Sequence, residues 1–476
     1  MWFLLAGFVL LLFSPSLGAD PTPAPGFTDD ALPLVDRAQH YLVDLIKIDS
    51  SNQSETKVAE YLRQVAAANG IPNELLGDNP KRLNFIARLK GSGKNKPLLL
   101  MAHSDTVPTG DRSLWTTDPF GAEIRNGFIW GRGSLDDKAL LAAELAVLVE
   151  IKTRNLPLSR DVILLSETDE ENGATGIQWM VQHAFPKIEA DFALNEGGSS
   201  FDSGGVRRVY QVQISEKIPT RILLTAHGAL GQGSLPRADN PLVRVARAML
   251  RIVDADQPVR LSATTRRYLR EIAKLPDYDW LNPLLAKLES PVAATQAAAA
   301  GQVRAKNPEL EVMIRTSVSP TTFRAGSRFN IIPNSAEALL DVRRLPNETR
   351  DEVLARFRQW INDPSVEVTL AAGPQMPPSD SSPVTSAMYK AIETVLTRLH
   401  PDDLVLPYMS RGSTDGSYLR ALKMPVYGAP LFEIDPADNR YHAVDERVPI
   451  KSLQDGTELL WQIVLEVAGG VSGGAN

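Results

Sequence analysis

Short apolar runs alternate with amphipathic helical patterns along much of the chain, and this alternation limits the fold more than any other feature. Four runs have the length of buried strands, namely 83–89, 96–102, 162–166 and 191–195. Apolar residues at helical spacing occupy the segments around them, at 31–47, 55–69, 137–154 and 174–184. Strands that are apolar on both faces need cover on both faces. The pattern therefore predicts an α/β fold with a mostly parallel sheet between helices.

The pattern changes between residues 213 and 345, and we interpret this segment as a smaller α+β domain inserted into the first domain. Strand-like runs lie at both ends of the segment, and an Ala-rich and Arg-rich helical stretch separates them at 241–305. The alternation then resumes, with helices expected at 349–361, 383–398 and 451–468. The prediction is a main domain in two parts, 30–212 and 346–470, with the smaller domain between them.

The N-terminus has the pattern of an export signal. An apolar run from Trp2 to Phe13 is too short to cross a bilayer comfortably, and small residues follow it. Residues 1–19 are therefore predicted to be a signal peptide, and residues 20–29 a linker. Retention of the run as an N-terminal membrane anchor is the alternative. After cleavage, no stable membrane span is expected.

Composition narrows the compartment and the chemistry. The chain of 476 residues has no Cys, which excludes disulfides, thiolate zinc sites and a cysteine nucleophile. A net charge of −7 without a long Lys/Arg run gives no sign of a nucleic-acid partner. An exported protein of this size without Cys fits a bacterial envelope, so we expect a periplasmic or secreted location.

Three of the predicted strands end in His or carboxylate side chains. In chain order these side chains are His103 and Asp105, then Asp169, Glu170 and Glu171, then Glu196. The binding crevice of an open parallel sheet lies beyond the carboxyl ends of its strands. One such His would more often be structural, but three such ends indicate a shared site. Imidazole and carboxylates without thiolate suit a divalent metal, above all zinc, whose charge offsets the crowding of acids.

A series of motifs resembles the M20 family of dinuclear zinc peptidases and aminoacylases. Between about residues 30 and 468 they are MAHSDTVP, GRGSLDDK, SETDEENGATG, NEGG, GQGSLP, FNIIP with LLDVR, SRGSTDGS and YHAVDERV. Within the family, the chain is similar to exported carboxypeptidases and N-acyl-amino-acid hydrolases with a long insertion. The resemblance implies that the main domain is catalytic and that the smaller domain is a lid or dimerisation domain.

The resemblance also implies two Zn²⁺ per subunit, held by His103, Asp136, Glu171, Glu196 and His442. His103 would bind one ion and His442 the other, and Asp136 would bridge the two ions. Glu171 would complete one site and Glu196 the other. In the family the peptide bond after the bridging Asp is cis, so the bond from Asp136 to the next residue is expected to be cis.

Two further acids have catalytic roles by the same resemblance. Glu170 is left without a metal to bind and would be the general base, which takes a proton from water and passes it to the leaving amine. Asp105 lies two residues after His103 and would orient the ligating imidazole.

Substrate binding is assigned by resemblance to both domains. Asn330 and Arg343 match residues that relatives use for the carbonyl and the terminal carboxylate, and Gly412 and Ser413 match a loop that lines the substrate pocket. Arg suits a carboxylate because it donates two parallel hydrogen bonds. An ordinary Arg at a strand end is the alternative interpretation of Arg343.

One motif departs from the family pattern. Relatives usually have a His in the lid motif that helps to stabilise the tetrahedral intermediate, whereas GQGSLP has Gln232 in that position. A Gln amide can donate a neutral hydrogen bond to an oxyanion but carries no positive charge. His227, five residues earlier, is the alternative donor.

Taken together, these features predict a zinc hydrolase that cleaves an amide bond beside a free α-carboxylate. The substrate would be a short peptide or an N-acyl amino acid. The alternative, motivated by Gln232, is a catalytically silent zinc-dependent binding or scaffold protein of the same fold. Some relatives are dimers whose lid motif reaches the neighbouring active site, and others are monomers with an enlarged lid. Both arrangements stay open here, and we favour a homodimer.

Overall fold

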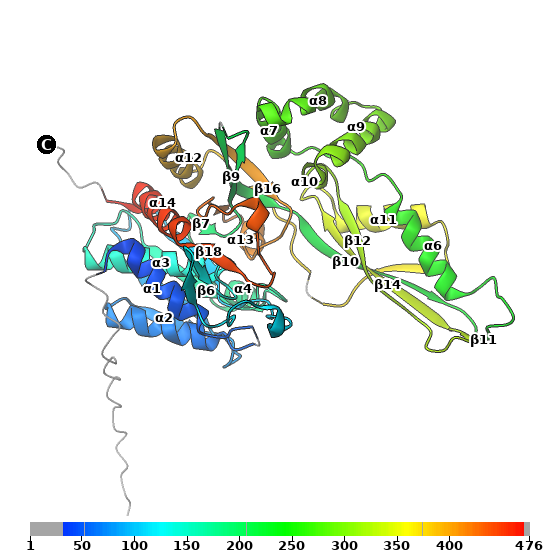
Figure 1. Ribbon diagram of the computed structural model, residues 1–476, viewed down its shortest axis with the longest axis horizontal. Coiled ribbons are helices and arrows are strands. Elements are labelled where there is room, and N and C mark those ends of the chain that lie inside the picture. Colours follow the sequence, from blue (N-terminus) through cyan, green and yellow to red (C-terminus); the bar gives the residue numbers. More distant parts are fainter. Residues whose placement is uncertain (1–31, 52, 206, 374, 471–476) are drawn as a thin grey trace, which may run out of the picture.

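The computed structural model describes residues 32–51, 53–205, 207–373 and 375–470. The predicted signal peptide and linker lie outside the described residues. The main domain and the elongated smaller domain lie side by side, and the chain first passes between them from β9 (Arg207–Glu216) to β10 (Ile218–His227) (Figure 1).

The main domain is built on a sheet with the strand order β1–β2–β6–β3–β7–β17–β9–β16, with β8 beside β9. Their bounds are β1 Asn73–Leu76, β2 Asn84–Leu89, β3 Leu98–His103, β6 Val162–Glu167, β7 Phe192–Asn195, β8 Ser199–Ser203, β16 Leu404–Ser410 and β17 Val426–Gly428. Strand β3 pairs in parallel with β6 and β7, and the pairs β7–β17 and β9–β16 are also parallel. The centre of the sheet is therefore parallel, and the predicted fold class is confirmed.

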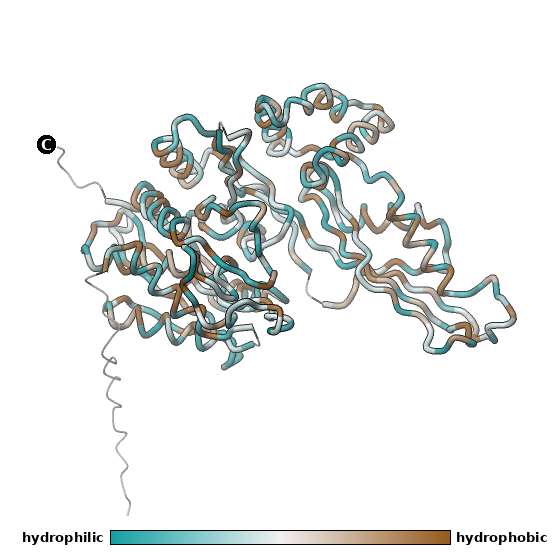
Figure 2. Tube along the Cα trace, viewed as in Figure 1, coloured by the Kyte–Doolittle hydropathy of each residue, from teal (hydrophilic) through white to brown (hydrophobic). Residues whose placement is uncertain are grey.

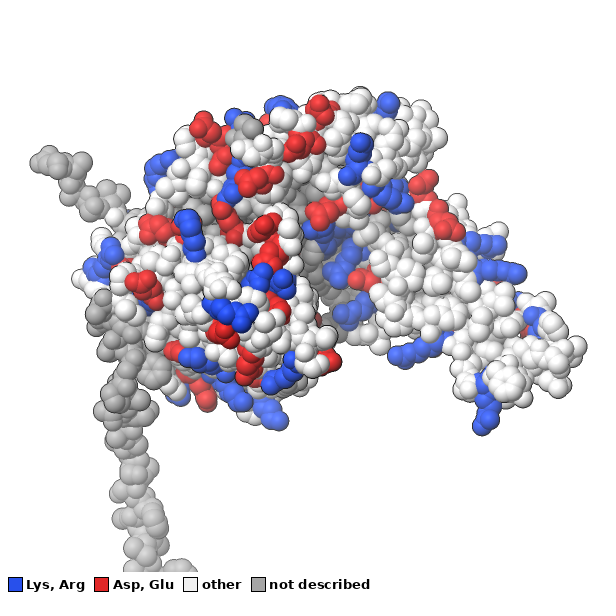
Figure 3. All heavy atoms as spheres, viewed as in Figure 1, with Lys and Arg blue, Asp and Glu red and all other residues white. Residues whose placement is uncertain are grey.

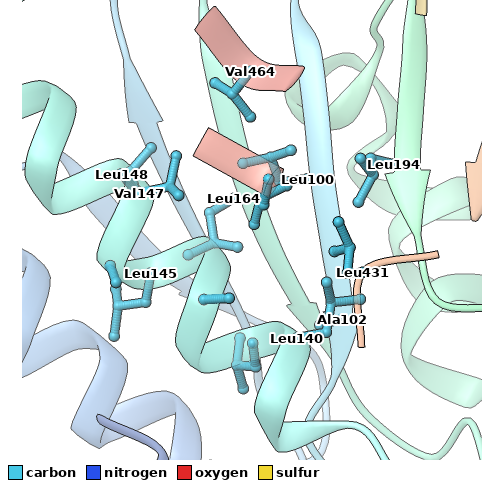
Figure 4. Close-up of a cluster of buried hydrophobic side chains, with 14 of the residues drawn as sticks. Leu100, Ala102, Leu140, Leu145, Val147, Leu148, Leu164, Leu194, Leu431 and Val464 are labelled. Atoms are coloured by element: carbon cyan, nitrogen blue, oxygen red, sulfur yellow. The ribbon is translucent and has the colours of Figure 1, made fainter. Parts of the chain in front are cut away.

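Strand β3 shows why this sheet is covered on both faces. Leu98 and Leu100 belong to one buried core, whereas Leu99 and Met101 belong to another. The first core is covered by α1 (Leu34–Ile46), α2 (Thr56–Ala68), α3 (Lys138–Thr153), α12 (Ala387–Leu399) and α14 (Ile450–Ala468). The second is covered by α4 (Thr175–His183), α5 (Phe185–Ile188) and α13 (Gly416–Ala421). Figure 4 shows Leu100 of the first core facing the helices.

Helix α3 carries a carboxyl group, Glu144, into the first core. The side chain is fully buried and forms no ion pair within the described ranges of the chain. Burial raises its pKa well above the ordinary value, and the nearby carboxyl of Glu167 adds to the shift. An acid with a raised folded pKa binds a proton on folding, so it weakens the fold increasingly as pH rises above its unfolded pKa.

We therefore expect Glu144→Gln to stabilise the protein at neutral pH and to have little effect at pH 4.5. The gain in unfolding free energy should grow by up to about 1.4 kcal/mol per pH unit until the folded pKa is reached. Urea unfolding at pH 5.5 and pH 7.5 measures this difference. Glu60→Gln, on the exposed side of α2, is the control and should show no such pH dependence. An equal gain for Glu144→Gln at both pH values would contradict the expectation.

The smaller domain is built on an antiparallel sheet with the order β12–β14–β10–β15. The added strands are β12 (Ser317–Ala325), β14 (Ser335–Arg344) and β15 (Val366–Leu370). Helices α6 (Pro241–Val253) and α11 (Arg350–Ile361) cover one face, where apolar residues such as Ile222 and Leu340 are buried. The alternate residues of β10 and β14 lie on the other face, which is open.

Strand β15 shows that the small sheet extends beyond the predicted domain boundary at residue 345. The strand pairs with β10, and Leu370 lies opposite Ile222. Buried Val366 and Val368 alternate with outward Glu367 and Thr369, which is the pattern of an antiparallel strand covered on one face. Helix α11 packs beside α6 on the same sheet. Both elements were assigned from sequence to the second part of the main domain, whereas their packing belongs to the smaller sheet.

The stretch at 241–305 folds into separate helices rather than one long element. After α6 come α7 (Ala263–Ile272), α8 (Asn282–Leu288), α9 (Ala293–Lys306) and α10 (Pro308–Val312). Pro residues in the first turn of α8 and α10 favour new starts, because Pro lacks the N–H that the first turn leaves unpaired. Helices α7–α10 share a core with Val209 of β9 and Leu406 of β16, so they cover the outer end of the main sheet.

Three short strands complete the part of the main domain that supports the site. Strands β4 (Glu123–Arg125), β5 (Phe128–Trp130) and β18 (Arg447–Pro449) form a small antiparallel sheet.

Hydrophilic and hydrophobic residues alternate along the helices of both domains (Figure 2). Among the described helices, none has both the length and the apolar character needed to cross a bilayer.

Candidate metal centre and active-site cleft

The three polar strand ends predicted from sequence come together in space. His103 is the last residue of β3, Glu170 and Glu171 follow β6, and Glu196 follows β7. These strands are neighbours in the order β6–β3–β7 and run parallel, so their carboxyl ends lie at one edge of the sheet. The site thus arises from the topology of the sheet centre.

Asp136 lies between two imidazoles that come from distant parts of the chain. Its Oδ1 is 2.9 Å from Nε2 of His103, and its Oδ2 is 3.0 Å from Nε2 of His442. Nε2 of His442 is also 3.0 Å from Oε1 of Glu171. A carboxylate that offers one oxygen towards each imidazole has the arrangement expected of a ligand between two metal ions.

The loop that carries Asp136 is held by Glu446, which the sequence analysis did not single out. The buried Glu446 carboxylate accepts the backbone N–H groups of Gly133 at 3.0 Å and Leu135 at 2.8 Å, and it pairs with Arg132. The peptide bond between Asp136 and Asp137 is cis, as the resemblance implied. The only signal for Glu446 in the sequence is its place in the motif YHAVDERV, four residues after His442.

Asp105 connects the imidazole of His103 to the loop after β6. Its Oδ1 is 3.5 Å from Nδ1 of His103, on the side of the ring away from Asp136. The same carboxylate accepts the backbone N–H groups of Glu170 at 3.1 Å and Glu171 at 3.2 Å. Burial acts to raise the pKa of Asp105, but these contacts outweigh it and hold the pKa below the ordinary value. Asp105 is therefore placed to fix the orientation of His103.

Two overlapping groups of side chains could hold a metal ion. Ligand atoms of His103, Asp136 and Glu171 lie within 4.8 Å of one another, and so do those of His103, Glu170 and Glu196. The predicted ligands are thus assembled at one place. Glu170 lies as close to His103 as the predicted ligands do. Distance alone therefore does not distinguish Glu170, the predicted general base, from the predicted metal ligands.

The electrostatics of the cluster indicate missing positive charge. Burial raises the pKa of Glu196 to about 8, and the carboxylates of Asp136 and Glu171 add to this shift. Burial and then the charge of Glu196 raise the pKa of Glu170 well above its ordinary value. Hydrogen bonds to Asp136 and Glu171 raise the pKa of His442 to about 10. Divalent cations at this point would relieve the repulsion among the acids.

The donor set fits such cations. It offers imidazole nitrogen and carboxylate oxygen without sulfur, which suits zinc among other divalent metals. Two imidazoles on opposite sides of one carboxylate, with further acids beside each, are enough for two ions. The residues present therefore fit a pair of divalent metal ions.

The cluster opens into a cavity of about 500 Å³ between the two domains. The main domain contributes Asp136, Glu170, Glu171, Glu196, Gly412, Ser413, Tyr418 and His442 to its lining. The open face of the smaller sheet contributes Pro219, Arg221, Thr321, Leu339, Asp341 and Arg343. Figure 3 shows the hollow between the domains, with basic side chains on the side of the smaller domain. Gly412, Ser413 and Arg343 thus lie in the cavity where their predicted roles require them.

Three other predicted residues do not reach this cavity. Gln232 lies in β11 (Gly231–Gln232), which pairs with β13 (Ile331–Ile332), and Asn330 directly precedes β13. This ribbon forms the tip of the smaller domain that is remote from the main domain (Figure 1). Exposed His227 ends β10 near the same tip. The roles of Gln232, Asn330 and His227 stay predictions.

The cavity also contains residues that sequence reasoning missed. Arg221 and Tyr418 are the polar members with the clearest chemistry. An Arg within a strand gives no functional signal until the strand register places it opposite Asp341. Tyr418 follows the recognised motif SRGSTDGS directly, so its position could have been noted.

An α/β domain with a His–carboxylate centre at its strand ends, facing a second domain across a cleft, defines a hydrolase of the metallopeptidase type. A family profile, Peptidase family M20/M25/M40, matches residues 99–466. The chain belongs to this family, and the resemblance inferred from its motifs is confirmed.

Similar proteins include both peptidases and hydrolases of N-acyl amino acids. The N-fatty-acyl-amino acid synthase/hydrolase PM20D1 of Homo sapiens is 25% identical over 450 residues, which cover 89% of this chain and 85% of the relative. The probable carboxypeptidase S-like 2 of Dictyostelium discoideum is 25% identical over 400 residues, which cover 80% and 75%. Among solved structures, the M20 family metallo-carboxypeptidase Sso-CP2 of Sulfolobus solfataricus matches with a TM-score of 0.70 and 21% identity, covering 91% of this chain and 99% of that one.

Proposed function

We propose that the protein is an exported dinuclear zinc hydrolase that cleaves the amide bond beside a free α-carboxylate in short peptides or N-acyl amino acids. The observation that carries this proposal is the carboxylate of Asp136, with one oxygen near His103 and the other near His442. Its relatives include a probable carboxypeptidase S-like protein and an N-fatty-acyl-amino acid synthase/hydrolase, and both of these activities concern an amide bond beside a free carboxylate.

The ligand sets are those that the family resemblance implies, and contacts within the cluster support them. His103, Asp136 and Glu196 would hold one zinc ion, and Asp136, Glu171 and His442 would hold the other. The contacts of Asp136 with both imidazoles, and of Glu171 with His442, support this division. When bound, the two ions lower the pKa of a water molecule and polarise the scissile carbonyl. Asp105 keeps the imidazole of His103 oriented from its far side.

The remaining acid, Glu170, would move the proton. It lines the cavity directly beside the ligands, and its backbone is fixed by Asp105. As the general base it takes a proton from the attacking water and then gives it to the nitrogen of the leaving amine. This sequence of transfers leaves Glu170 as a carboxylate at the end of the reaction.

A catalytically silent zinc-dependent binding protein is the competing proposal, since Gln232 replaces the usual lid His. A panel of dipeptides and N-acyl amino acids, assayed for amine release with added zinc, separates the two. Release of amine from a member of the panel supports the hydrolase. Zinc binding without release from any member would overturn it in favour of the silent protein.

We further propose that the enzyme is a homodimer assembled through the smaller domain. Helix α6 presents Val243, Leu250 and Val253 to solvent, with exposed fractions of 37%, 53% and 44%. Their spacing of seven and three residues places them, with Ala246 between them, on one stripe of the helix. At the domain tip, Phe329 is fully exposed. An exposed apolar stripe of this kind is typical of an association surface.

Leu250→Glu is expected to shift the protein from dimer to monomer, because it places a charge in the middle of the α6 stripe. Sedimentation at micromolar concentration measures the change. Lys390→Glu, at an exposed position on α12 of the main domain, is the control and should leave the dimer intact. A wild-type protein that sediments as a fully active monomer would refute the proposed dimer.

A further inference from the structure

The cleft wall of the smaller domain carries a short row of charged side chains. In the register of β10 and β14, Arg221 lies opposite Asp341, and Pro219 lies opposite Arg343. All of them are on the open face of the sheet and line the cavity. The row therefore faces the acidic cluster of the main domain across about 500 Å³ of space.

Arg343, the predicted carboxylate ligand, already has an acceptor. Its Nε is 3.0 Å from Oδ1 and 3.2 Å from Oδ2 of Asp341, and its Nη2 is 3.1 Å from Oδ2. Asp341 thus occupies the Nε–Nη2 edge of the guanidinium. Only the outer edge of Arg343 remains for a ligand, and its positive charge is already offset.

Arg221, in contrast to Arg343, has no acceptor for its guanidinium among the described residues. Within the described part of the chain, its guanidinium forms no hydrogen bond and no ion pair, although Asp341 lies directly across the strand pair. Its backbone is fixed, because its carbonyl oxygen accepts the N–H of Ala371 at 2.9 Å. An Arg on a rigid strand with all five N–H donors free is suited to bind a planar anion from the cleft.

We propose that Arg221 is the principal binding residue for the free carboxylate of the substrate, with the outer edge of Arg343 as its second donor. This inference rests on the proposed function and specifies the substrate class further. Two guanidinium groups and the one carboxylate of Asp341 leave a single net positive charge in the row. The row therefore accepts one carboxylate, and a second carboxylate on the substrate finds no compensating charge there.

The rest of the lining agrees with a substrate that has one charge. Apart from the proposed ligand His442, the main-domain wall carries carboxylates and no basic side chain, so it offers no cation of its own to a second carboxylate. Pro219, Leu339 and Met376 add apolar surface beside the charged row. The expected substrates are thus N-acyl or N-peptidyl derivatives of neutral, apolar amino acids, rather than of Asp or Glu.

The test compares N-acetyl-leucine with N-acetyl-leucinamide, which has the same shape but no carboxylate. With the zinc-loaded protein, Arg221→Ala should lower kcat/KM for the acid by about tenfold or more, mainly through KM, as expected for loss of a charge-assisted hydrogen bond. The value for the amide should stay unchanged. Arg221→Lys should restore part of the loss, because it keeps the charge but not the paired donors.

Arg324→Ala is the matched control. Arg324 lies opposite Glu337 on β14, further from the main domain, and it does not line the cavity, so its removal changes the net charge equally without touching the row. A second arm uses Asp341→Asn, which removes one negative charge. The substitution frees the guanidinium of Arg343 and raises the net charge of the row by one. This variant should improve the kcat/KM for N-acetyl-glutamate relative to that for N-acetyl-leucine.

The outcomes separate this inference from the proposed function. If wild-type protein with added zinc cleaves neither compound nor N-acetyl-glutamate, the hydrolase proposal fails for these substrates. Calorimetric binding of the acid and the amide to the same variants then still decides the role of Arg221. Equal losses for acid and amide in Arg221→Ala, or a loss no larger than in Arg324→Ala, would overturn the assignment of Arg221.

Discussion

The Glu170→Gln variant is expected to lose at least about two orders of magnitude in turnover while it keeps the zinc content of the wild type. Glu170 lines the cavity, and Asp105 holds its backbone N–H at 3.1 Å. An amide of the same size cannot take a proton from water, so proton transfer is lost while the five proposed metal ligands stay in place. Turnover and metal content are measured on one preparation.

Glu171→Gln is the matched control, because Glu171 is proposed to be a metal ligand whereas the adjacent Glu170 is proposed to be the general base. Oε1 of Glu171 is 3.0 Å from Nε2 of His442, so its loss should lower zinc content together with turnover. The comparison is needed because the ligand atoms of Glu170 also lie within 4.8 Å of those of His103 and Glu196. Loss of metal in Glu170→Gln with retention in Glu171→Gln would mean that the two roles are exchanged.

The architecture of the main domain could be predicted because its signals are local. A strand such as Leu98–His103 is buried on both faces, so it reads as a continuous apolar run that only a covered sheet can accommodate. The helices at its sides have apolar residues at helical spacing, and α3 is buried along nearly its whole length. Each of these features is present within about ten consecutive residues.

The division of the chain between the two sheets could not be predicted in the same way. Strand β15 and helix α11 have ordinary patterns that fit either domain, and pairing with β10 across more than a hundred residues decides their place. The sequences of helices α7–α10 likewise contain no local pattern that predicts their packing against β9 and β16. Such choices depend on tertiary packing, which a local pattern does not contain.

The candidate site divides along the same line. His103, Glu170 and Glu196 could be inferred from strand ends, because the carboxyl ends of neighbouring parallel strands meet. Asp136 and His442 are 306 residues apart and came only from motif resemblance. The role proposed for Arg221 could not be inferred without the register of β10 against β14. The register places Arg221 opposite Asp341, and Asp341 already accepts hydrogen bonds from Arg343.

The Gln232→Ala variant is expected to lower kcat by about 10²–10³ with little change in KM, as removal of an oxyanion donor does. Gln232 lies outside the cavity of its own chain, so this effect requires the tip of the smaller domain to meet an active site. Gln232→His should keep or raise kcat, because it restores the usual family residue. His227→Ala should be nearly silent, and the reverse result for the two alanine variants would assign the donor to His227.

Subunit mixing decides where that meeting occurs. In a homodimer whose tips reach the neighbouring cleft, Gln232→Ala disables the partner's site, whereas Glu170→Gln disables the site of its own chain. A mixed dimer then has one site with both defects and one intact site, so co-expression of the two inactive variants should restore about a quarter of wild-type activity at random pairing. If each chain used its own Gln232, every site would keep one defect and nothing would recover. Exchange of tips predicts one active site in every mixed dimer. A dimeric sample that recovers no activity would therefore exclude the exchange of tips between subunits.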